Sequence, residues 1–525
     1  MPDASPRERL LVAAGVLAFL FLVTFKGGVF VYQFHKASSG AWLDEGARVL
    51  DGEAMYRDFV DPHGPGIVHL NALAFALVGR HVNAAAGAAL LGALLLAVAL
   101  HTLAARLAPW PWRLLPPLAL AVVIVPPFDF GHPRWPALAL GVLALERIGA
   151  HGPGPRGLLR AGLLLGASAL FGPDVALPLA AGVVAAVATA GARAVRGRAL
   201  GAFALGLLVL PGLGFTALAL RAGPGAVLRG WLTEPLAAAL GEAGGLALSP
   251  WGVRPAVFLA LGLGGIAAAA GALRRRDEPR AALARVVAMA GLCLAAVALL
   301  GPLDPYALAV RTVPLLPLLA AALPGWSAGK GVLPRWTARA LLLVLALGVA
   351  HGLGLVALRQ WTLPLVRQRF RAGAVWIGAP NVELPWLESH APPGARVFVF
   401  PAGGGSYFLT ATRNATAFPY AVEGRFTPAE QERALRALDA AEAEAGIWMG
   451  GQQAAAAGDP RALDRLESGI RARYRTAAAL PGGSLALLRG PGPAPSGTHS
   501  DAGRSGAPLT GTNAPSVSAS GRSSR

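Results

Sequence analysis

Six carboxylates stand close together between residues 42 and 79, directly after the first apolar run of the chain. They are Asp44, Glu45, Asp51, Glu53, Asp58 and Asp61. The sequence around them is apolar enough to lie in a membrane, where a charged side chain is costly unless it has a function. Two adjacent acids such as Asp44 and Glu45 suit a general base beside a group that binds substrate or holds a cation. The alternative is a solvated acidic loop without a chemical role.

Basic groups in the same segment could hold an anion. Arg57, in the run YRDF, is the cation nearest to this cluster. It either binds a phosphate or forms an ion pair with Asp58 or Asp61, and a surface ion pair contributes little. His63 stands in the turn DPHGP and either contacts substrate or is solvated.

A second loop, PPFDFGHPRWP, offers another group of candidates. It contains Asp129, His132 and Arg134, followed by Trp135. These side chains could join the acidic pair in one site. The alternative is a tight proline-rich turn in which Trp135 anchors the chain at the membrane interface.

Composition indicates the elements that must position these residues. Of 525 residues, 54% are hydrophobic and only 14% are charged, whereas soluble domains average about 25% charged residues. Apolar runs of about 17–25 residues predict transmembrane helices and not an outer-membrane barrel. Most basic residues lie in short loops between these runs, where they set orientation. The net charge of +18 therefore does not indicate nucleic-acid binding. The single cysteine, Cys293, excludes a disulfide within the chain.

The alternation of basic and acidic loops predicts about eleven spans, with the N-terminus in the cytoplasm and the C-terminus outside. The first helix is expected to be retained and to run to about Val31. Residues 66–79 are too short to cross, so they predict an amphipathic helix on the outer surface. Residues 32–83 then form one external loop, in which a short helix is expected to follow the acidic pair, over residues 46–59. The multi-span domain covers residues 1–358.

Residues 359–490 predict a small α/β domain outside the membrane. The runs ARVFVF, IWMGG and SLALLRG are typical of strands. The run TPAEQERALRALDAAEAEA predicts a helix with Thr427 as N-cap, Pro428 at its first position and Glu430 at its third. PAGGGSYFLT, residues 401–410, is interpreted as a turn. Asn414-Ala415-Thr416 has the form of a glycosylation site but is expected to have no such role. Residues 491–525, rich in Gly, Pro, Ser and Thr, are expected to be disordered.

The first third of the chain resembles the GT-C superfamily of membrane glycosyltransferases, in particular the bacterial enzymes that depend on polyprenyl-phosphate sugars. Relatives of those enzymes include protein O-mannosyltransferases and lipid A aminoarabinose transferases. The resemblance rests on the acidic pair, a spaced G-x-x-x-Y-x-D, a proline-containing turn and a short apolar helix that ends in glycine. Here these are Asp44-Glu45, Gly52 to Asp58 with Tyr56, Asp61-Pro62-His63-Gly64-Pro65, and Gly79. Many relatives have two adjacent prolines where this chain has His63-Gly64-Pro65.

The resemblance implies an all-α polytopic membrane protein with a small C-terminal α/β domain, located in the cytoplasmic membrane. It implies transfer of a sugar from a polyprenyl-phosphate donor to an acceptor outside that membrane, with inversion. Asp44 would be the base, Glu45 its neighbour and Asp129 a third acid. Arg57, Asp58, His63, His132 and Arg134 would bind substrate. The acceptor, whether glycan, lipid or protein, stays open.

No cofactor is predicted with certainty. A divalent cation at the acidic pair is compatible with the sequence, but no metal site is predicted, since no histidine pair has the spacing of zinc ligands. Two other functions remain open. One is a transporter or flippase of lipid-linked glycans, although such proteins usually carry polar groups inside their spans and a second half related to the first. The other is a non-catalytic membrane scaffold.

Overall fold

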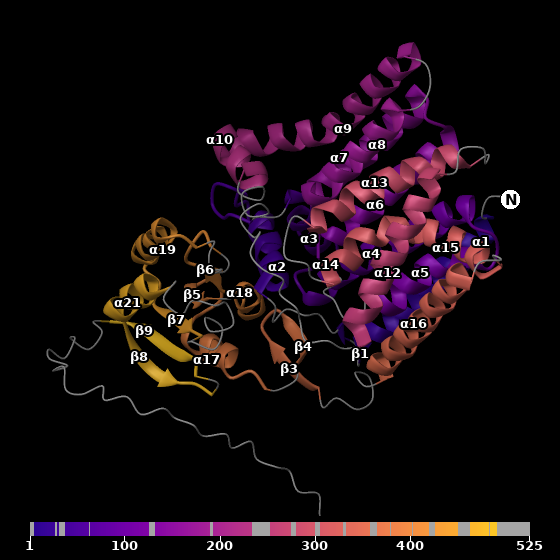
Figure 1. The fold of residues 1–525 in the computed structure, drawn as a ribbon. Helices are drawn as coiled ribbons and strands as arrows, with labels where there is room; N and C mark the ends of the chain where they lie inside the picture. Colours follow the sequence, from indigo (N-terminus) through magenta and orange to yellow (C-terminus); the bar gives the residue numbers. More distant parts are fainter. Residues whose placement is uncertain are drawn as a thin grey trace, which may run out of the picture.

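The structure, a computed structural model, describes most of the chain. The described residues are 5–26, 29–30, 37–61, 64–124, 132–189, 193–233, 253–274, 280–299, 305–328, 332–357, 365–377, 380–401, 403–418, 426–449, 463–481 and 483–490. They form a large helical part and a smaller C-terminal lobe with a central sheet (Figure 1). The predicted disordered tail, Asp129 and His63 lie outside the described residues.

The helical part runs from α1 to α16. Its α-helices are α1 (Pro6–Thr24), α2 (Ala37–Leu50), α3 (Pro65–Val78), α4 (Val82–Leu107), α5 (Leu115–Leu118), α6 (Arg134–His151), α7 (Pro155–Phe171), α8 (Pro173–Ala188), α9 (Arg193–Ala222), α10 (Pro224–Leu228), α12 (Val253–Arg274), α13 (Ala281–Leu299), α14 (Pro305–Thr312), α15 (Leu316–Ala328) and α16 (Val332–Ala357). Shorter turns are η1 (Trp112–Leu114), η2 (Ala119–Ile124), η3 (Arg229–Thr233) and η4 (Val313–Leu315), and β1 (Phe25–Lys26) pairs with β2 (Val29–Phe30).

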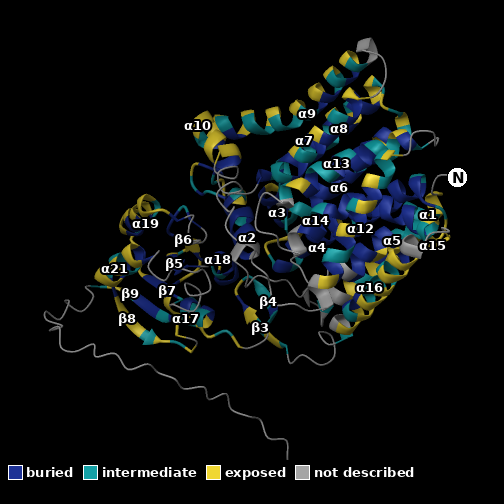
Figure 2. Ribbon diagram, in the orientation of Figure 1, coloured by how far each residue is buried: buried dark blue, intermediate teal, exposed yellow. Residues whose placement is uncertain are grey.

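Five helices in the described part of the chain are long and apolar enough to cross a membrane. They lie in α4, α9, α12, the α14–α15 stretch and α16. In α9 and α16 only 17% of the most apolar window is buried inside the protein. Their outer faces carry exposed leucines (Figure 2), and long apolar helices with such faces are suited to contact lipid. The polytopic helical architecture is confirmed, whereas the prediction of about eleven spans is not.

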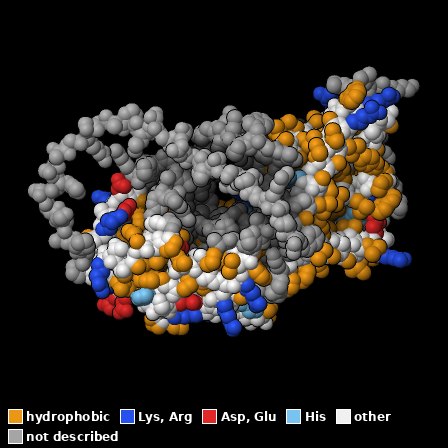
Figure 3. Space-filling model, turned by 90° about the horizontal axis from the view of Figure 1, so that it is seen from below, with side chains coloured by type: hydrophobic (Ala, Val, Ile, Leu, Met, Phe, Trp, Pro, Cys, Tyr) orange, Lys and Arg blue, Asp and Glu red, His pale blue; other side chains and the backbone are white. Residues whose placement is uncertain are grey.

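The surface chemistry of the two parts differs. Seen from below, hydrophobic side chains cover much of the helical part, while acidic and basic side chains gather on the lobe and at the ends of the helical part (Figure 3). The largest apolar cluster lies inside the helical bundle. This distribution fits a bundle surrounded by lipid and a lobe surrounded by water.

Local sequence explains several helix ends. Proline occupies the first turn of α1, α3, α7 and α8, where its missing N–H has no helical partner to lose. Ser5 caps α1 by accepting a hydrogen bond from the Glu8 amide at 3.1 Å. The prediction that the first helix runs to about Val31 is wrong, because α1 ends at Thr24 and the β1–β2 hairpin follows.

The acidic segment contains α2 and α3. The short apolar helix predicted over residues 66–79 is confirmed as α3, although one side of it is buried. The helix predicted over residues 46–59 is wrong: α2 starts at Ala37, so Asp44 and Glu45 lie within it, and the chain after Leu50 forms turns. Tyr56 adopts a positive φ of 70° there, a backbone conformation that ends any helix.

The lobe is built on a five-stranded mixed sheet in the order β6-β5-β7-β9-β8. Its elements, with the preceding hairpin, are β3 (Val366–Phe370), β4 (Gly373–Ile377), α17 (Glu383–His390), β5 (Arg396–Phe400), α18 (Gly404–Thr410), β6 (Arg413–Asn414), α19 (Pro428–Ala440), β7 (Ala445–Trp448), α21 (Asp464–Arg473), β8 (Tyr474–Ala479) and β9 (Leu485–Arg489). β5 is parallel to β6 and β7, whereas β9 is antiparallel to β7 and β8. The three predicted strands are confirmed as β5, β7 and β9.

Side chains alternate along β5 and so cover both faces of the sheet. Phe398 and Phe400 pack in one apolar cluster with residues of α19 and α21. Val397 and Val399 pack on the other face, with Tyr407 of α18. The predicted capping box of α19 is confirmed: the Thr427 hydroxyl accepts from the Glu430 amide at 3.3 Å, and Glu430 accepts from the Thr427 amide at 2.7 Å. The predicted turn at residues 401–410 is wrong, because it contains α18.

Candidate active site

The acidic helix α2 lies between the helical part and the lobe (Figure 1). It packs against α3 on one side and α18 on the other. Asn71 of α3 donates a hydrogen bond to the Trp42 carbonyl at 3.0 Å. Asp44 is only 3% exposed and Glu45 is fully buried. The adjacent acids are therefore not a solvated acidic loop.

Burial sets the protonation of Asp44. Desolvation raises its pKa from 3.8 to about 7; the positive charge of Arg48 opposes this shift, and Glu53 and Asp51 add to it. A general base works best when its pKa lies near the pH at which it operates. Asp44 therefore has the protonation behaviour of a base at neutral pH.

Glu45 faces a second buried acid, Asp61. Burial raises the pKa of Glu45 well above its usual value, and the charge of Asp61 and a hydrogen bond with it raise it further. Apart from Asp61, no group among the described residues hydrogen-bonds to the Glu45 oxygens. Burial beside a second acid therefore disfavours the charged form of Glu45.

Arg48, one turn after Asp44, connects three segments of the chain. Its Nε donates to Glu53 Oε2 at 2.6 Å, its Nη2 to the Asp58 carbonyl at 3.0 Å and its Nη1 to the Thr416 carbonyl at 3.4 Å. The guanidinium also lies 4.8 Å from the centre of the Phe59 ring. The Arg48 side chain is only 9% exposed, so its positive charge acts mainly on groups inside the protein.

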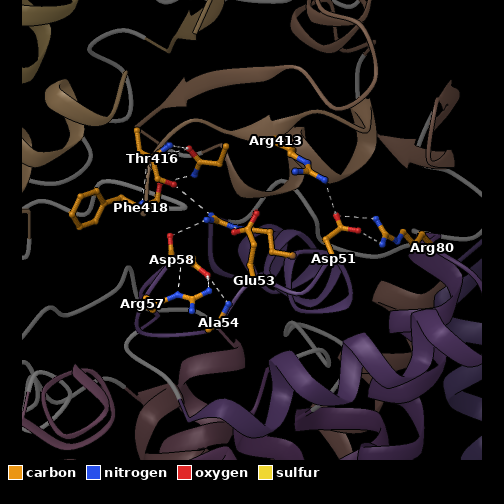
Figure 4. Close-up of polar contacts among 11 residues, drawn as sticks. Asp51, Glu53, Ala54, Arg57, Asp58, Arg80, Arg413, Thr416 and Phe418 are labelled. Carbon is orange, nitrogen blue, oxygen red and sulfur yellow. Dashed lines mark hydrogen bonds and ion pairs between the residues drawn. The ribbon is translucent and has the colours of Figure 1, made fainter. Parts of the chain in front are cut away.

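The rim of the site carries weaker contacts. Asp51 lies between Arg80 and Arg413 (Figure 4). Arg80 Nη1 donates to Asp51 Oδ2 at 3.1 Å, and Arg413 Nη2 lies 3.8 Å from the same oxygen. Both arginine side chains are about half exposed (44% and 51%), so solvent screens these pairs.

Arg57 and Asp58 form an ion pair, one of the two predicted alternatives. Arg57 Nε and Nη2 donate to the two carboxylate oxygens of Asp58 at 3.0 and 2.8 Å (Figure 4). These hydrogen bonds lower the pKa of Asp58. Arg57 is 55% exposed, so it remains accessible to a ligand, and its role in substrate binding stays a prediction.

The described end of the second loop reaches the acidic helix. The His132 ring contacts Trp42 edge-on, with 5.3 Å between ring centres. The backbone N–H of Arg134 donates to His132 Nδ1 at 3.1 Å, and Arg134 Nε lies 3.3 Å from Asp174. The structure thus brings His132 beside α2 and places Arg134 in an ion pair with α8.

Sequence reasoning assigned no role to Arg48, and it considered Asp61 only as an ion-pair partner of Arg57 and as part of the proline-containing turn. Arg48 follows Asp44 by four positions, a spacing at which helical side chains are neighbours, so a helix starting at Ala37 would have revealed it. Asp61 had no comparable signal, because its approach to Glu45 depends on the turns after α2. Among the described residues no three His, Cys, Asp or Glu side chains converge as a metal site would require.

The chain combines a bundle of apolar helices, a buried acidic pair in α2 and an α/β lobe packed against that helix, and solved structures share this fold. The chain is similar in structure to ArnT from Cupriavidus metallidurans in the apo state, with 14% identity, a TM-score of 0.56 and coverage of 92% of this chain and 98% of that one. ArnT bound to undecaprenyl phosphate gives 13% identity, a TM-score of 0.52 and coverage of 92% and 99%.

The apo oligosaccharyltransferase of Archaeoglobus fulgidus gives 11% identity, a TM-score of 0.53 and coverage of 93% of this chain and 75% of that one. No protein-family model and no curated protein matches the sequence. The resemblance to GT-C proteins is therefore confirmed at the level of the fold, and the chain is a multi-pass membrane protein of this architecture.

Proposed function

We propose that the chain is a membrane glycosyltransferase that moves one sugar from a polyprenyl-phosphate donor to an acceptor on the outer side of the cytoplasmic membrane. The observation that carries the proposal is Asp44, a buried carboxyl group whose pKa is raised to about 7 at the junction of the helical part and the lobe. The GT-C fold supports it. A similar structure bound to undecaprenyl phosphate supports the class of donor.

In this mechanism Asp44 accepts the proton of an acceptor hydroxyl. The hydroxyl oxygen then forms a bond to the anomeric carbon of the donor sugar from the face opposite the phosphate. The bond between that carbon and the phosphate oxygen breaks, and the polyprenyl phosphate leaves with the electron pair. The configuration at the anomeric carbon is inverted. Because the acceptor proton goes to Asp44, the enzyme must begin each cycle with this carboxyl group ionised.

The other residues have subsidiary roles in the proposal. Glu45, the neighbour of the base, would hydrogen-bond the acceptor, and Asp129 would be a further acid. Arg57, His132 and Arg134 would bind the donor, since a guanidinium matches a phosphate in charge and geometry. Asp58 would orient Arg57 through their two hydrogen bonds.

The proposal also includes a topology. Residues 1–358 form the membrane domain with about eleven spans, and the lobe at residues 359–490 lies outside the cytoplasmic membrane. The positive-inside distribution of arginines supports this orientation. To test the orientation, Cys293 is replaced and single cysteines are introduced in residues 32–83 and 359–490. Cysteines in both regions must react with a thiol reagent that does not cross the membrane.

The test of function is transfer of a labelled sugar from polyprenyl-phosphate donors in membranes. Wild type is compared with Asp44→Asn and with Asp439→Asn at equal expression. Asp439 pairs with Arg473 in the lobe at 2.8 Å and lies outside the proposed site. We expect Asp44→Asn to lower the rate about 10²–10⁴-fold and Asp439→Asn to retain it. Equal rates in wild type and Asp44→Asn would refute the assignment of the base. Movement of the intact lipid-linked glycan across the membrane without transfer would favour the flippase.

A further inference from the structure

The C-terminal lobe contacts the acidic helix backbone to backbone. A Cβ atom placed on Gly404, at the start of α18, would lie 2.4 Å from both the Cα and the N atoms of Ala41 in α2. Only glycine permits this approach. The Phe408 ring of α18 also stacks on Phe75 of α3, with 5.1 Å between ring centres. The lobe is thus packed closely against the helices that carry and support the acidic pair.

Hydrogen bonds join the lobe to the turn after α2. The Val60 amide donates to the Ala417 carbonyl at 3.1 Å, and Arg48 donates to the Thr416 carbonyl at 3.4 Å. Figure 4 shows Thr416 and Phe418 facing the segment that contains Glu53 and Asp58. Arg48 contacts both the turn that follows α2 and the lobe.

Hydrogen bonds within the lobe segment at residues 414–418 define its conformation. Asn414 Oδ1 accepts from the Thr416 amide at 2.9 Å, and Asn414 Nδ2 donates to the Phe418 carbonyl at 2.8 Å. The Phe418 amide donates to the Thr416 hydroxyl at 3.2 Å. Asn414 is only 8% exposed. The glycosylation-like triplet therefore has a structural role: it fixes the carbonyl that receives Arg48.

We propose that Arg48 is a positioning residue through which the C-terminal lobe holds Asp44 in the orientation needed for catalysis. The proposal rests on the proposed function for its catalytic part, whereas the mechanical link between lobe and helix stands on the contacts alone. In this proposal Arg48 acts through its contacts within the protein, with Glu53, Asp58 and Thr416, and not through donor or acceptor. It acts on Asp44 in two ways: it fixes α2 against the lobe, and it places a buried positive charge one helical turn from the base.

The charge effect has a definite direction. Arg48 opposes the rise in the pKa of Asp44 that burial causes, so removing it disfavours the ionised base. The other charged and titratable groups that act on or border Asp44 from its own helix, the following turn and α18 are Glu45, Asp51, Glu53 and Tyr407. None of these supplies a second positive charge, and the cation Arg48 therefore has no substitute among them.

The catalytic arm compares Arg48→Gln, Arg48→Lys and wild type in the full-length protein in lipid nanodiscs. We expect Arg48→Gln to lower kcat about tenfold at pH 7 and to move the acid limb of the pH–kcat profile to higher pH. Arg48→Lys keeps the positive charge, so the acid limb of the pH–kcat profile should stay at the same pH. It loses the planar set of hydrogen-bond donors, so kcat should still fall. The matched control is Arg473→Gln, which breaks an ion pair on the far side of the lobe.

The mechanical arm uses hydrogen–deuterium exchange and requires no substrate. Asn414→Ala releases the segment that presents the Thr416 carbonyl. We expect faster exchange over residues 37–50 in both Asn414→Ala and Arg48→Gln, and no change there in Arg473→Gln. The combined Arg48→Gln and Asn414→Ala protein should exchange little faster than either single variant, because both changes break the same link.

The outcomes separate the two proposals. If wild type transfers no sugar but exchange over α2 rises in both variants, the proposed function fails and the link between lobe and helix holds. If transfer occurs but Arg48→Gln leaves the acid limb in place, the catalytic part of this proposal is wrong. If Asn414→Ala leaves exchange over residues 37–50 unchanged, the lobe does not hold the helix through the Thr416 carbonyl, whatever the activity.

Discussion

Replacing Asp44 by asparagine should stabilise the protein at alkaline pH while it strongly slows transfer. Asp44 is buried and ionises only near pH 7, whereas in the unfolded chain it ionises near its usual value of 3.8. Between these values the folded state binds the proton more strongly. The free energy of unfolding therefore falls as pH rises from about 4 to about 7, and the loss is complete above pH 7. Asparagine cannot ionise, so the variant lacks this loss.

The magnitude follows from the shift. A rise from 3.8 to about 7, at about 1.4 kcal/mol per pKa unit, corresponds to about 4 kcal/mol of destabilisation above pH 7. The new amide group offsets part of this gain, since an unpaired buried amide costs about 1–3 kcal/mol. Asp44 Oδ2 already has no hydrogen-bond partner among the described groups. We therefore expect a net gain of about 2 kcal/mol at pH 8.5 and none at pH 5.

The assay is thermal unfolding followed by tryptophan fluorescence in one detergent, at pH 5 and pH 8.5. Unfolding of membrane proteins is commonly irreversible, so apparent Tm values are compared at a single scan rate. The quantity that matters is the change in the difference between variant and wild type as the pH is raised. We expect Asp44→Asn to gain several degrees relative to wild type at pH 8.5. An equal difference at both pH values would contradict the raised pKa and, with it, the physical basis of the proposed base.

Three further predictions follow from the same site and lobe. Glu45→Gln keeps the size of the side chain and removes a carboxyl group whose charged form burial disfavours, so we expect it to change stability at pH 7 by less than about 1 kcal/mol. A larger loss would show that the fold depends on the carboxyl group of Glu45. Arg57→Gln should raise the KM for the donor several-fold. Because Arg57 is exposed, both kcat and the apparent Tm should stay unchanged. An unaltered KM would show that Arg57 is not part of the donor site. Thr427→Ala should lower the stability of the lobe by about 1 kcal/mol, because α19 loses its N-cap. Sugar transfer at 25 °C should be unchanged. A stability equal to that of wild type in denaturant titrations would contradict the capping box.

The parts of the fold that follow local rules could be predicted from sequence. Apolar length predicts α4 and α16, and the pattern of Thr427 and Glu430 before an amphipathic run predicts the start of α19. β5 was visible as a short run of buried residues bounded by turns. In each case the physical cause lies within a few residues of the element itself.

The predictions that were wrong concern segments whose structure depends on contacts with residues distant in the sequence. A helical start at Ala37 was missed because residues 37–41 carry no charged cap or strong periodicity, and this part of α2 is held by packing against α3 and α18. α18 was interpreted as a turn because Gly403, Gly404 and Gly405 usually indicate a loop. Gly404 is required there for contact with α2. The bond from Arg48 to Thr416 joins residues 368 positions apart, and no local pattern predicts it.

The position of the lobe also bears on the proposed role of Asp44 as a base at neutral pH. Burial is the largest cause of the raised pKa of Asp44, and α18 of the lobe covers one side of the helix that carries it. Without the lobe, water would reach this side chain and its pKa would return toward 3.8. A carboxylate with that pKa is a much weaker base for a hydroxyl proton. In the proposed mechanism the lobe would therefore contribute to the chemistry without supplying a reacting group: it would keep water from Asp44 and hold Arg48, whose charge opposes the rise in the pKa of Asp44.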